Sequence, residues 1–87
     1  MSDTFKTVDV YIQSATLPKL NVTGWTCNNI YNRGTRVGPD AKISCHMTDV
    51  FQCRFEMALG ASRAQIAQLL GTLSEQGFRW MDVHPIL

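Results

Sequence analysis

Three cysteines and two histidines are the side chains best suited to metal binding or nucleophilic chemistry in this 87-residue sequence. Cys45, His46 and Cys53 lie in the stretch SCHMTDVFQC, whereas Cys27 and His84 lie apart from it. A structural zinc site needs four convergent ligands and usually takes two of them from a closely spaced cysteine pair, which is missing here. We therefore predict that the cysteines are reduced core residues and that the protein has no metal or other cofactor.

The pattern around these cysteines is typical of β-structure. From residue 41 to residue 59 the large apolar side chains occupy odd positions and polar side chains even positions, except at Asp49 and Val50. One strand of this length would span roughly 60 Å, against about 30 Å for the diameter of a domain this size. We therefore predict a hairpin that turns at Thr48–Asp49. This hairpin would place Cys45 opposite Cys53, and a metal-stabilised domain that uses these two thiols remains an alternative.

Catalysis is not expected from these residues. Cys53 and His46 are the only nucleophile and base that lie close together, but the alternation places them on opposite faces of the strand. Asp82 and His84 share a face of the last strand, and no nucleophile is implied beside them. The prediction is a protein that is not an enzyme.

The stretch NNIYNRGTRVGPD, residues 28–40, is rich in turn-forming asparagine, glycine and proline, and we predict that it is the main long loop. Arg33 and Arg36 give it two guanidinium groups, which suit carboxylates or phosphates. The alternative is a solvated loop without a ligand. The residues predicted to contact a partner are Trp25, Asn28, Asn29, Tyr31, Asn32, Arg33 and Arg36.

The remaining elements follow from local patterns. Residues 5–13 alternate in a way that predicts a strand, and residues 20–27 predict a second strand that forms a hairpin with the first, with Gly24 as a bulge or kink. Ser62 and Gln65 have the spacing of a helical capping box. The helix that follows buries an apolar stripe made of Ile66, Leu69, Leu70 and Leu73.

The end of the chain gives a helix stop and a final strand. Gly77 is placed to end the helix, with Phe78 packing back on Leu73, and residues 78–83 predict a strand that Pro85 stops. The expected fold is therefore an α+β domain over residues 1–87, with a mostly antiparallel sheet of four to five strands and one helix on one face. The expected order is β-β-β-β-α-β, in which the last strand could run parallel to an earlier one after a right-handed crossover.

Composition limits the classes of partner and location. The net charge of +1 gives no general attraction to nucleic acid or acidic membranes. No apolar run resembles a signal peptide or a membrane span, so we expect a cytoplasmic protein without a membrane partner. The sheet face without a helix carries apolar and aromatic groups, which predicts contact with a protein partner or a homodimer.

Together these features suggest a non-enzymatic module that acts by binding protein, as a small inhibitor or adaptor. A phage or mobile-element product that blocks a host defence complex, of the anti-CRISPR type, is one such class. The alternative to protein binding is a nucleic-acid-binding domain that uses the Arg33/Arg36 loop, with Trp25 stacking on bases.

Overall fold

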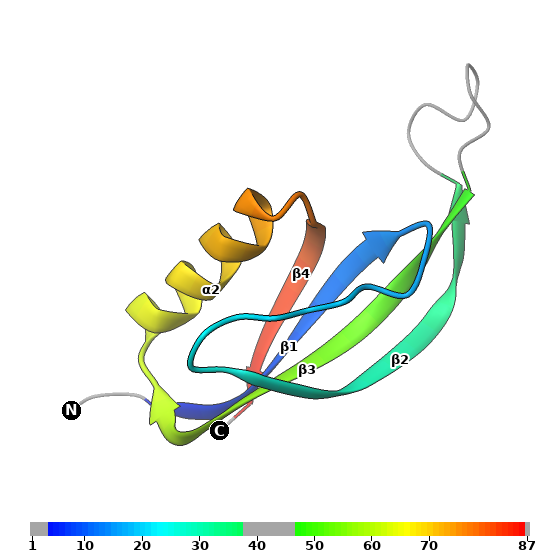
Figure 1. Ribbon diagram of the computed structural model, residues 1–87. Coiled ribbons are helices and arrows are strands. Elements are labelled where there is room, and N and C mark those ends of the chain that lie inside the picture. Colours follow the sequence, from blue (N-terminus) through cyan, green and yellow to red (C-terminus); the bar gives the residue numbers. More distant parts are fainter. Residues whose placement is uncertain (1–3, 38–46, 87) are drawn as a thin grey trace.

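The computed structural model describes residues 4–37 and 47–86. Its elements are, in chain order, β1 (Phe5–Ser14), β2 (Thr26–Val37), β3 (Met47–Ala61), α2 (Arg63–Glu75) and β4 (Arg79–Ile86). The strands form one sheet in the order β2-β3-β1-β4, and each neighbouring pair is antiparallel. Figure 1 shows α2 packed over one face of this sheet. The predicted α+β fold with an antiparallel sheet is confirmed, while the possible parallel placement of the last strand is wrong.

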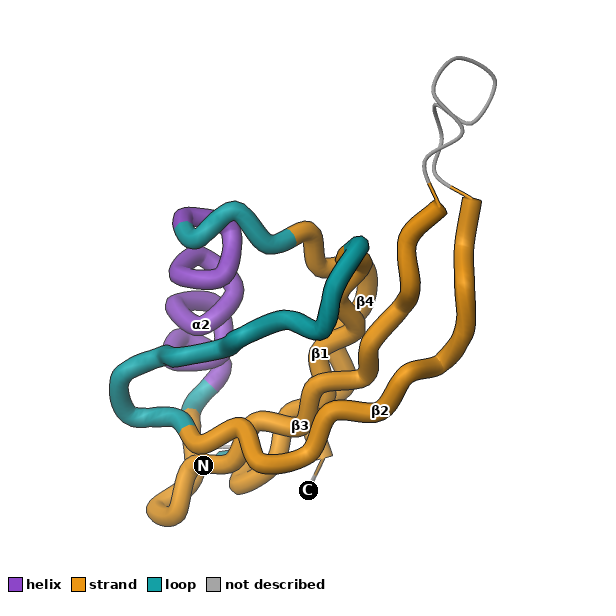
Figure 2. The backbone as a smooth tube through the Cα atoms, turned by 45° about the vertical axis from the view of Figure 1, so that its right-hand side comes forward, coloured by secondary structure: helices purple, strands orange, loops and turns teal. Residues whose placement is uncertain are grey.

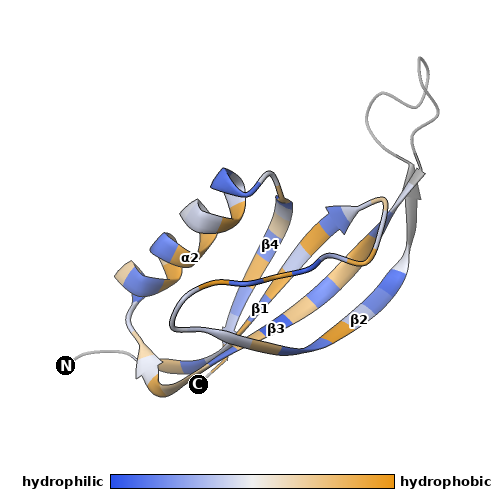
Figure 3. Ribbon diagram, in the orientation of Figure 1, coloured by the Kyte–Doolittle hydropathy of each residue, from blue (hydrophilic) through white to orange (hydrophobic). Residues whose placement is uncertain are grey.

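Strand β1 is one of the two inner strands of the sheet, and its face toward α2 is apolar from Val8 to Ile12. Val8, Val10 and Ile12 are completely buried on the side of α2, as the period-two pattern predicted. Hydrophobic and hydrophilic bands alternate along β1 and β3 in Figure 3. Because the other face of the sheet has no helix, its residues need polar partners of their own.

Strand β3 is a single long strand, so the hairpin predicted at Thr48–Asp49 is wrong. These two residues lie inside β3 and pair with Arg36 and Thr35 of β2. The prediction assumed a round molecule, whereas the protein extends 48 × 20 × 20 Å. A 15-residue strand of about 50 Å fits along the longest axis.

Strand β2 occupies most of the segment that was predicted to be a loop. Ile30 and Tyr31 pair with Cys53 and Gln52 of β3, and these cross-strand contacts outweigh the turn preference of the neighbouring asparagines. The pairing with β3 is irregular at two places, between Cys27 and Asn29 and between Asn32 and Thr35. The turn-forming residues at these places have no regular partner on β3. The predicted loop is therefore largely an edge strand.

Residues 15–25 form a connection rather than the predicted second strand. Figures 1 and 2 show this connection crossing the helix side of the sheet before β2 begins. A tight turn closes it, in which the Trp25 amide donates to the Val22 carbonyl at 3.0 Å and Gly24 has a positive φ of 89°. The predicted N-terminal hairpin is therefore wrong, because β1 pairs with β3 and β4 instead.

Helix α2 begins and ends where the sequence predicted. The Ser62 hydroxyl accepts from the Gln65 amide at 3.3 Å, and the Gln65 side chain accepts from the Ser62 amide at 2.8 Å. At the other end, the Phe78 amide donates to the Leu73 carbonyl at 3.0 Å, with Gly77 at a φ of 88°. The buried residues of the helix are Ile66, Leu69 and Leu73.

Replacing Ser62 by alanine should lower the free energy of unfolding by about 1 kcal/mol, because the capping hydroxyl is lost. In a domain of this size such a loss corresponds to a Tm about 4–8 °C lower. Thermal denaturation followed by circular dichroism measures it. Gln68→Ala, on the exposed surface of the same helix, is the matched control and should leave Tm nearly unchanged. Equal effects of the two substitutions would contradict the capping role.

Strand β4 continues past the predicted stop and includes Pro85, which pairs with Val8. Proline lacks the amide donor of a sheet ladder and is tolerated only where that position faces outward. The strand satisfies this condition because β4 is an edge of the sheet.

Candidate functional site

The sheet face opposite α2, named the open face below, is a surface of interacting polar side chains. Cross-strand register places Asp9 beside Arg54 and His84, and Tyr11 beside Gln52 and Asp82. Strand β2 adds Tyr31 beside Gln52 and Asn29 beside Arg54. The polar residues of this face include Thr7, Asp9, Tyr11, Asn29, Tyr31, Arg33, Gln52, Arg54, Glu56, Asp82 and His84.

Asp9 lies at the centre of this face and is only 4% exposed. Arg54 binds both of its carboxylate oxygens, through Nε at 2.8 Å and a terminal nitrogen at 3.0 Å. Gln52 donates its side-chain amide to Oδ2 at 2.9 Å. The Arg54 hydrogen bonds lower the pKa of Asp9, burial opposes this, and the Gln52 bond adds to the lowering. Asp9 is therefore an ionised, fully bonded carboxylate near neutral pH.

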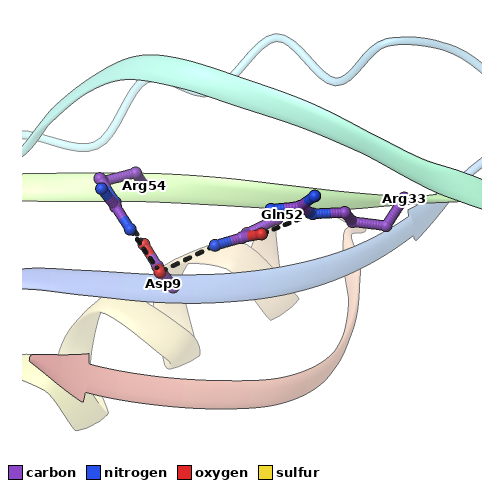
Figure 4. A network of polar contacts seen from close by, with 4 residues as sticks. All are labelled: Asp9, Arg33, Gln52 and Arg54. Atoms are coloured by element: carbon purple, nitrogen blue, oxygen red, sulfur yellow. Dashed lines mark hydrogen bonds and ion pairs between the residues drawn. The ribbon is translucent and has the colours of Figure 1, made fainter.

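Gln52 extends this network to Arg33, as Figure 4 shows. The Arg33 Nε donates to the Gln52 Oε1 at 2.7 Å, and the guanidinium carbon lies 5.5 Å from the centre of the Tyr31 ring. Gln52 is 7% exposed, whereas Arg33 and Tyr31 are exposed. The network thus runs from a buried carboxylate to an arginine at the surface.

Asp82 and His84 form a second polar group on the open face. Their side chains are 2.9 Å apart, and His84 meets the Tyr11 ring edge-on at a centroid distance of 5.5 Å. The hydrogen bond to His84 lowers the pKa of Asp82. This geometry orients the imidazole, but both described cysteines point to the other face of the sheet, so no cysteine–histidine catalytic pair forms with His84.

The two described cysteines behave as core residues. Cys27 and Cys53 are free thiols, half-buried and buried respectively. Burial raises the pKa of both, that of Cys53 to about 12. Cys53 pairs with Val10 and Ile30, so the pairing with Cys45 through a local hairpin is not formed; Cys45 and His46 themselves lie outside the described residues. Within residues 4–37 and 47–86, no three metal-ligating side chains converge.

The Cys53 thiol should resist modification in the folded protein, because its thiolate form is suppressed. The test is a variant that carries Cys27→Ser and Cys45→Ser, treated with a thiol reagent at pH 8. We expect almost no labelling in buffer and complete labelling in denaturant. A matched variant that keeps only Cys27 should react faster in buffer because Cys27 is half-buried. Equally rapid labelling of both native variants would show that the strand opens locally.

The residues predicted to bind a partner are divided between the two faces. Tyr31, Arg33 and Asn29 lie on the open face. Trp25 lies on the helix side, where its ring meets Phe55 edge-on at 6.4 Å. The others are placed as follows: Asn28 lies at a register irregularity, the Asn32 side chain donates to Asp49, and Arg36 pairs through its backbone with Thr48, while its side chain is not described.

Sequence reasoning missed the polar centre formed by Asp9, Gln52 and Arg54. The available signal was the alternation itself, because each of these residues stands between two apolar residues that face the helix. What could not be predicted was the register between β1 and β3, which brings Asp9 opposite Arg54. The incorrect hairpin prediction removed that pairing from consideration.

The hollows of the described part of the protein include three cavities, one of which borders the open face. One of about 440 Å³ lies between β4 and the start of α2, one of about 260 Å³ lies beside Trp25, and one of about 370 Å³ lies beside Thr7 and Glu56. Neither Arg33 nor Tyr31 lines any of the three. The surface at Arg33 is thus outside these hollows.

Comparison with known proteins supplies the family. Residues 4–87 match the family model of the bacterial isocitrate dehydrogenase C-terminal domain, which covers nearly the whole chain. The chain belongs to this family. No curated protein and no solved structure gives a significant match.

The family corrects the expected function. The prediction of a non-enzymatic inhibitor or adaptor, encoded by a phage or mobile element and directed against host defence, is wrong because the isocitrate dehydrogenase family is one of metabolic enzymes. The prediction that the protein is not an enzyme is wrong for the same reason. The alternatives offered with it, nucleic-acid binding and metal stabilisation through Cys45 and Cys53, are set aside.

Within residues 4–37 and 47–86, no helix combines the length and apolar character needed to cross a bilayer. The cytoplasmic location expected from the sequence remains a prediction.

Proposed function

We propose that this chain serves as the C-terminal domain of an isocitrate dehydrogenase, within which it associates with the catalytic part of the enzyme. The observation that carries the proposal is the family match over residues 4–87. The enzyme as a whole would oxidise isocitrate, as the family name states, and this chain would contribute a surface to its assembly.

The structure supports a contribution through binding at a surface. The helix side of the sheet is occupied by α2 and by the connection over residues 15–25 (Figure 2). The open face carries charged and aromatic side chains that are held in place by one another. A surface of fixed polar groups suits specific contact with another protein, since little side-chain freedom is lost on binding.

The first test mixes the purified chain with the isocitrate dehydrogenase polypeptide of the same organism, prepared without this domain. We expect the two to co-elute in size-exclusion chromatography and the chain to lengthen the half-life of isocitrate oxidation at elevated temperature, because ligand binding stabilises the bound state. The negative control is a Phe55→Ala chain, whose fold is expected to be strongly destabilised. Separate elution together with an unchanged half-life would refute the proposal.

A further inference from the structure

The two edges of the sheet are poorly suited to pairing with another strand. Strand β2 has two register irregularities, at Cys27/Asn29 and Asn32/Thr35, and bulges of this kind turn an edge away from strand addition. Strand β4 carries Pro85 and a register irregularity opposite Tyr11 and Ile12. Since α2 and the connection over residues 15–25 lie on the helix side, the open face is the sheet surface that the chain itself leaves uncovered.

Two arginines on the open face differ in how their hydrogen-bond donors are used. Arg54 directs Nε and one terminal nitrogen to Asp9 and is thereby committed to an internal ion pair. Arg33 uses only Nε, which donates to Gln52. Its two terminal nitrogens have no hydrogen-bond partner among the described residues, so Arg33 retains donors for a ligand.

The orientation of Arg33 is fixed because the oxygen and the nitrogen of the Gln52 side-chain amide cannot change places. The ionised carboxylate of Asp9 only accepts hydrogen bonds, so the Gln52 nitrogen must face it. The guanidinium of Arg33 only donates, so the Gln52 oxygen must face that side. If the Gln52 amide were turned end for end, its oxygen would face the Asp9 carboxylate and its NH2 group would face the Arg33 guanidinium. Neither hydrogen bond could then form. Gln52 is therefore a positioning residue that holds the Arg33 guanidinium beside the Tyr31 ring.

The ligand class follows from the donors and from the neighbouring charges. A guanidinium with free terminal nitrogens fits a carboxylate or a phosphate group. On the same face Asp9 is already paired with Arg54, and Asp82 with His84, so the terminal nitrogens of Arg33 are the donors left for an added carboxylate among these groups. The proposed function supplies a protein partner, so the carboxylate is taken to be a side chain of that protein.

We propose that Arg33, held by Gln52 and flanked by Tyr31, anchors an aspartate or glutamate side chain of the catalytic part of isocitrate dehydrogenase. This inference rests on the proposed function, because it names a contact within that association. Arg33 would bind the carboxylate through its terminal nitrogens while Nε stays on Gln52. The ring of Tyr31, whose residue is 42% exposed, would cover one side of the ion pair.

The test measures the affinity of the chain for the catalytic polypeptide by isothermal titration calorimetry. Arg33→Ala should weaken binding by about tenfold or more, because charge-assisted hydrogen bonds are lost. Arg33→Lys should also weaken it, since lysine keeps the charge but lacks the fork. Lys19→Ala is the matched control: it removes one exposed positive charge from the connection on the helix side and should change affinity less than about twofold. Circular dichroism verifies that each variant is folded.

The outcomes separate this inference from the proposed function. Wild-type binding that Arg33→Ala and Arg33→Lys leave unchanged would overturn the inference alone. No binding by the wild-type chain would overturn both. A second arm titrates the chain alone with citrate, a small carboxylate. If the chain binds citrate and Arg33→Ala abolishes this binding, the ligand of Arg33 is a small molecule, and the proposed contact with a protein carboxylate is overturned. If the chain does not bind citrate, the proposed contact is supported.

Discussion

Replacing Phe55 by alanine is expected to cost about 3–5 kcal/mol of stability, the largest effect of any substitution considered. Phe55 is 1% exposed in the middle of β3, where it lies opposite Val8 and Cys27 and meets the Trp25 ring edge-on. An 87-residue domain has a total stability of only about 4–13 kcal/mol. The loss therefore amounts to between about a quarter of this stability and all of it. Urea denaturation at 25 °C measures the loss.

Leu59→Ala is the matched control for this substitution. Leu59 lies on the same strand but is 94% exposed, so its truncation removes almost no buried surface. The free energy of unfolding should change by less than about 0.5 kcal/mol. If Leu59→Ala proved as destabilising as Phe55→Ala, the assignment of the two β3 residues to core and surface would be wrong.

The second large effect concerns Asp9 and should appear as acid sensitivity. The pKa of Asp9 is lowered in the folded state, so ionised Asp9 stabilises the fold at every pH above its unfolded value of about 4. This contribution is lost as the pH falls through the lower, folded pKa. We expect the free energy of unfolding to decrease steadily below about pH 4. Urea denaturation at a series of pH values measures this slope.

Asp9→Asn should remove part of that slope and destabilise the protein near neutral pH. An asparagine would direct an amide donor at Arg54 or Gln52, which are donors themselves, at a cost of about 2 kcal/mol. Glu56→Gln on the same face is the control, because Glu56 is exposed, and it should alter neither stability nor slope. An Asp9→Asn variant with the stability and pH profile of the wild type would disprove a structural role for this carboxylate.

Local patterns in the sequence were sufficient for α2 and for β1. The capping box at Ser62 and the glycine stop at Gly77 act within one or two turns, and alternation along β1 reports directly on a half-buried strand. Local patterns could not predict which strands pair with one another in the sheet. The ion pair between Asp9 and Arg54 joins residues that are 45 positions apart in the sequence. It depends on the register between two strands, which no local pattern indicates.

The error at Thr48–Asp49 arose from an assumption about shape rather than about residues. The alternation correctly indicated a long strand, but the expected round domain had no room for it. The elongated sheet accommodates β3 without a turn and lets β2 pair along most of it. The turn-forming residues between Asn28 and Gly34 then lie at register irregularities of an edge strand. Composition alone does not distinguish such a strand from a loop.

The strand order has a consequence for the rate of folding. β1 is central, yet its partners are β3 and β4, and Thr7 pairs with Ile86 at the far end of the sequence. The antiparallel pair β2–β3 closes a much shorter loop and can form early, whereas β1 must wait for long loop closures. Until then the apolar face of β1 formed by Val8, Val10 and Ile12 is uncovered. Slow docking of β1 between its two neighbours would therefore set both the folding rate and the period of greatest aggregation risk.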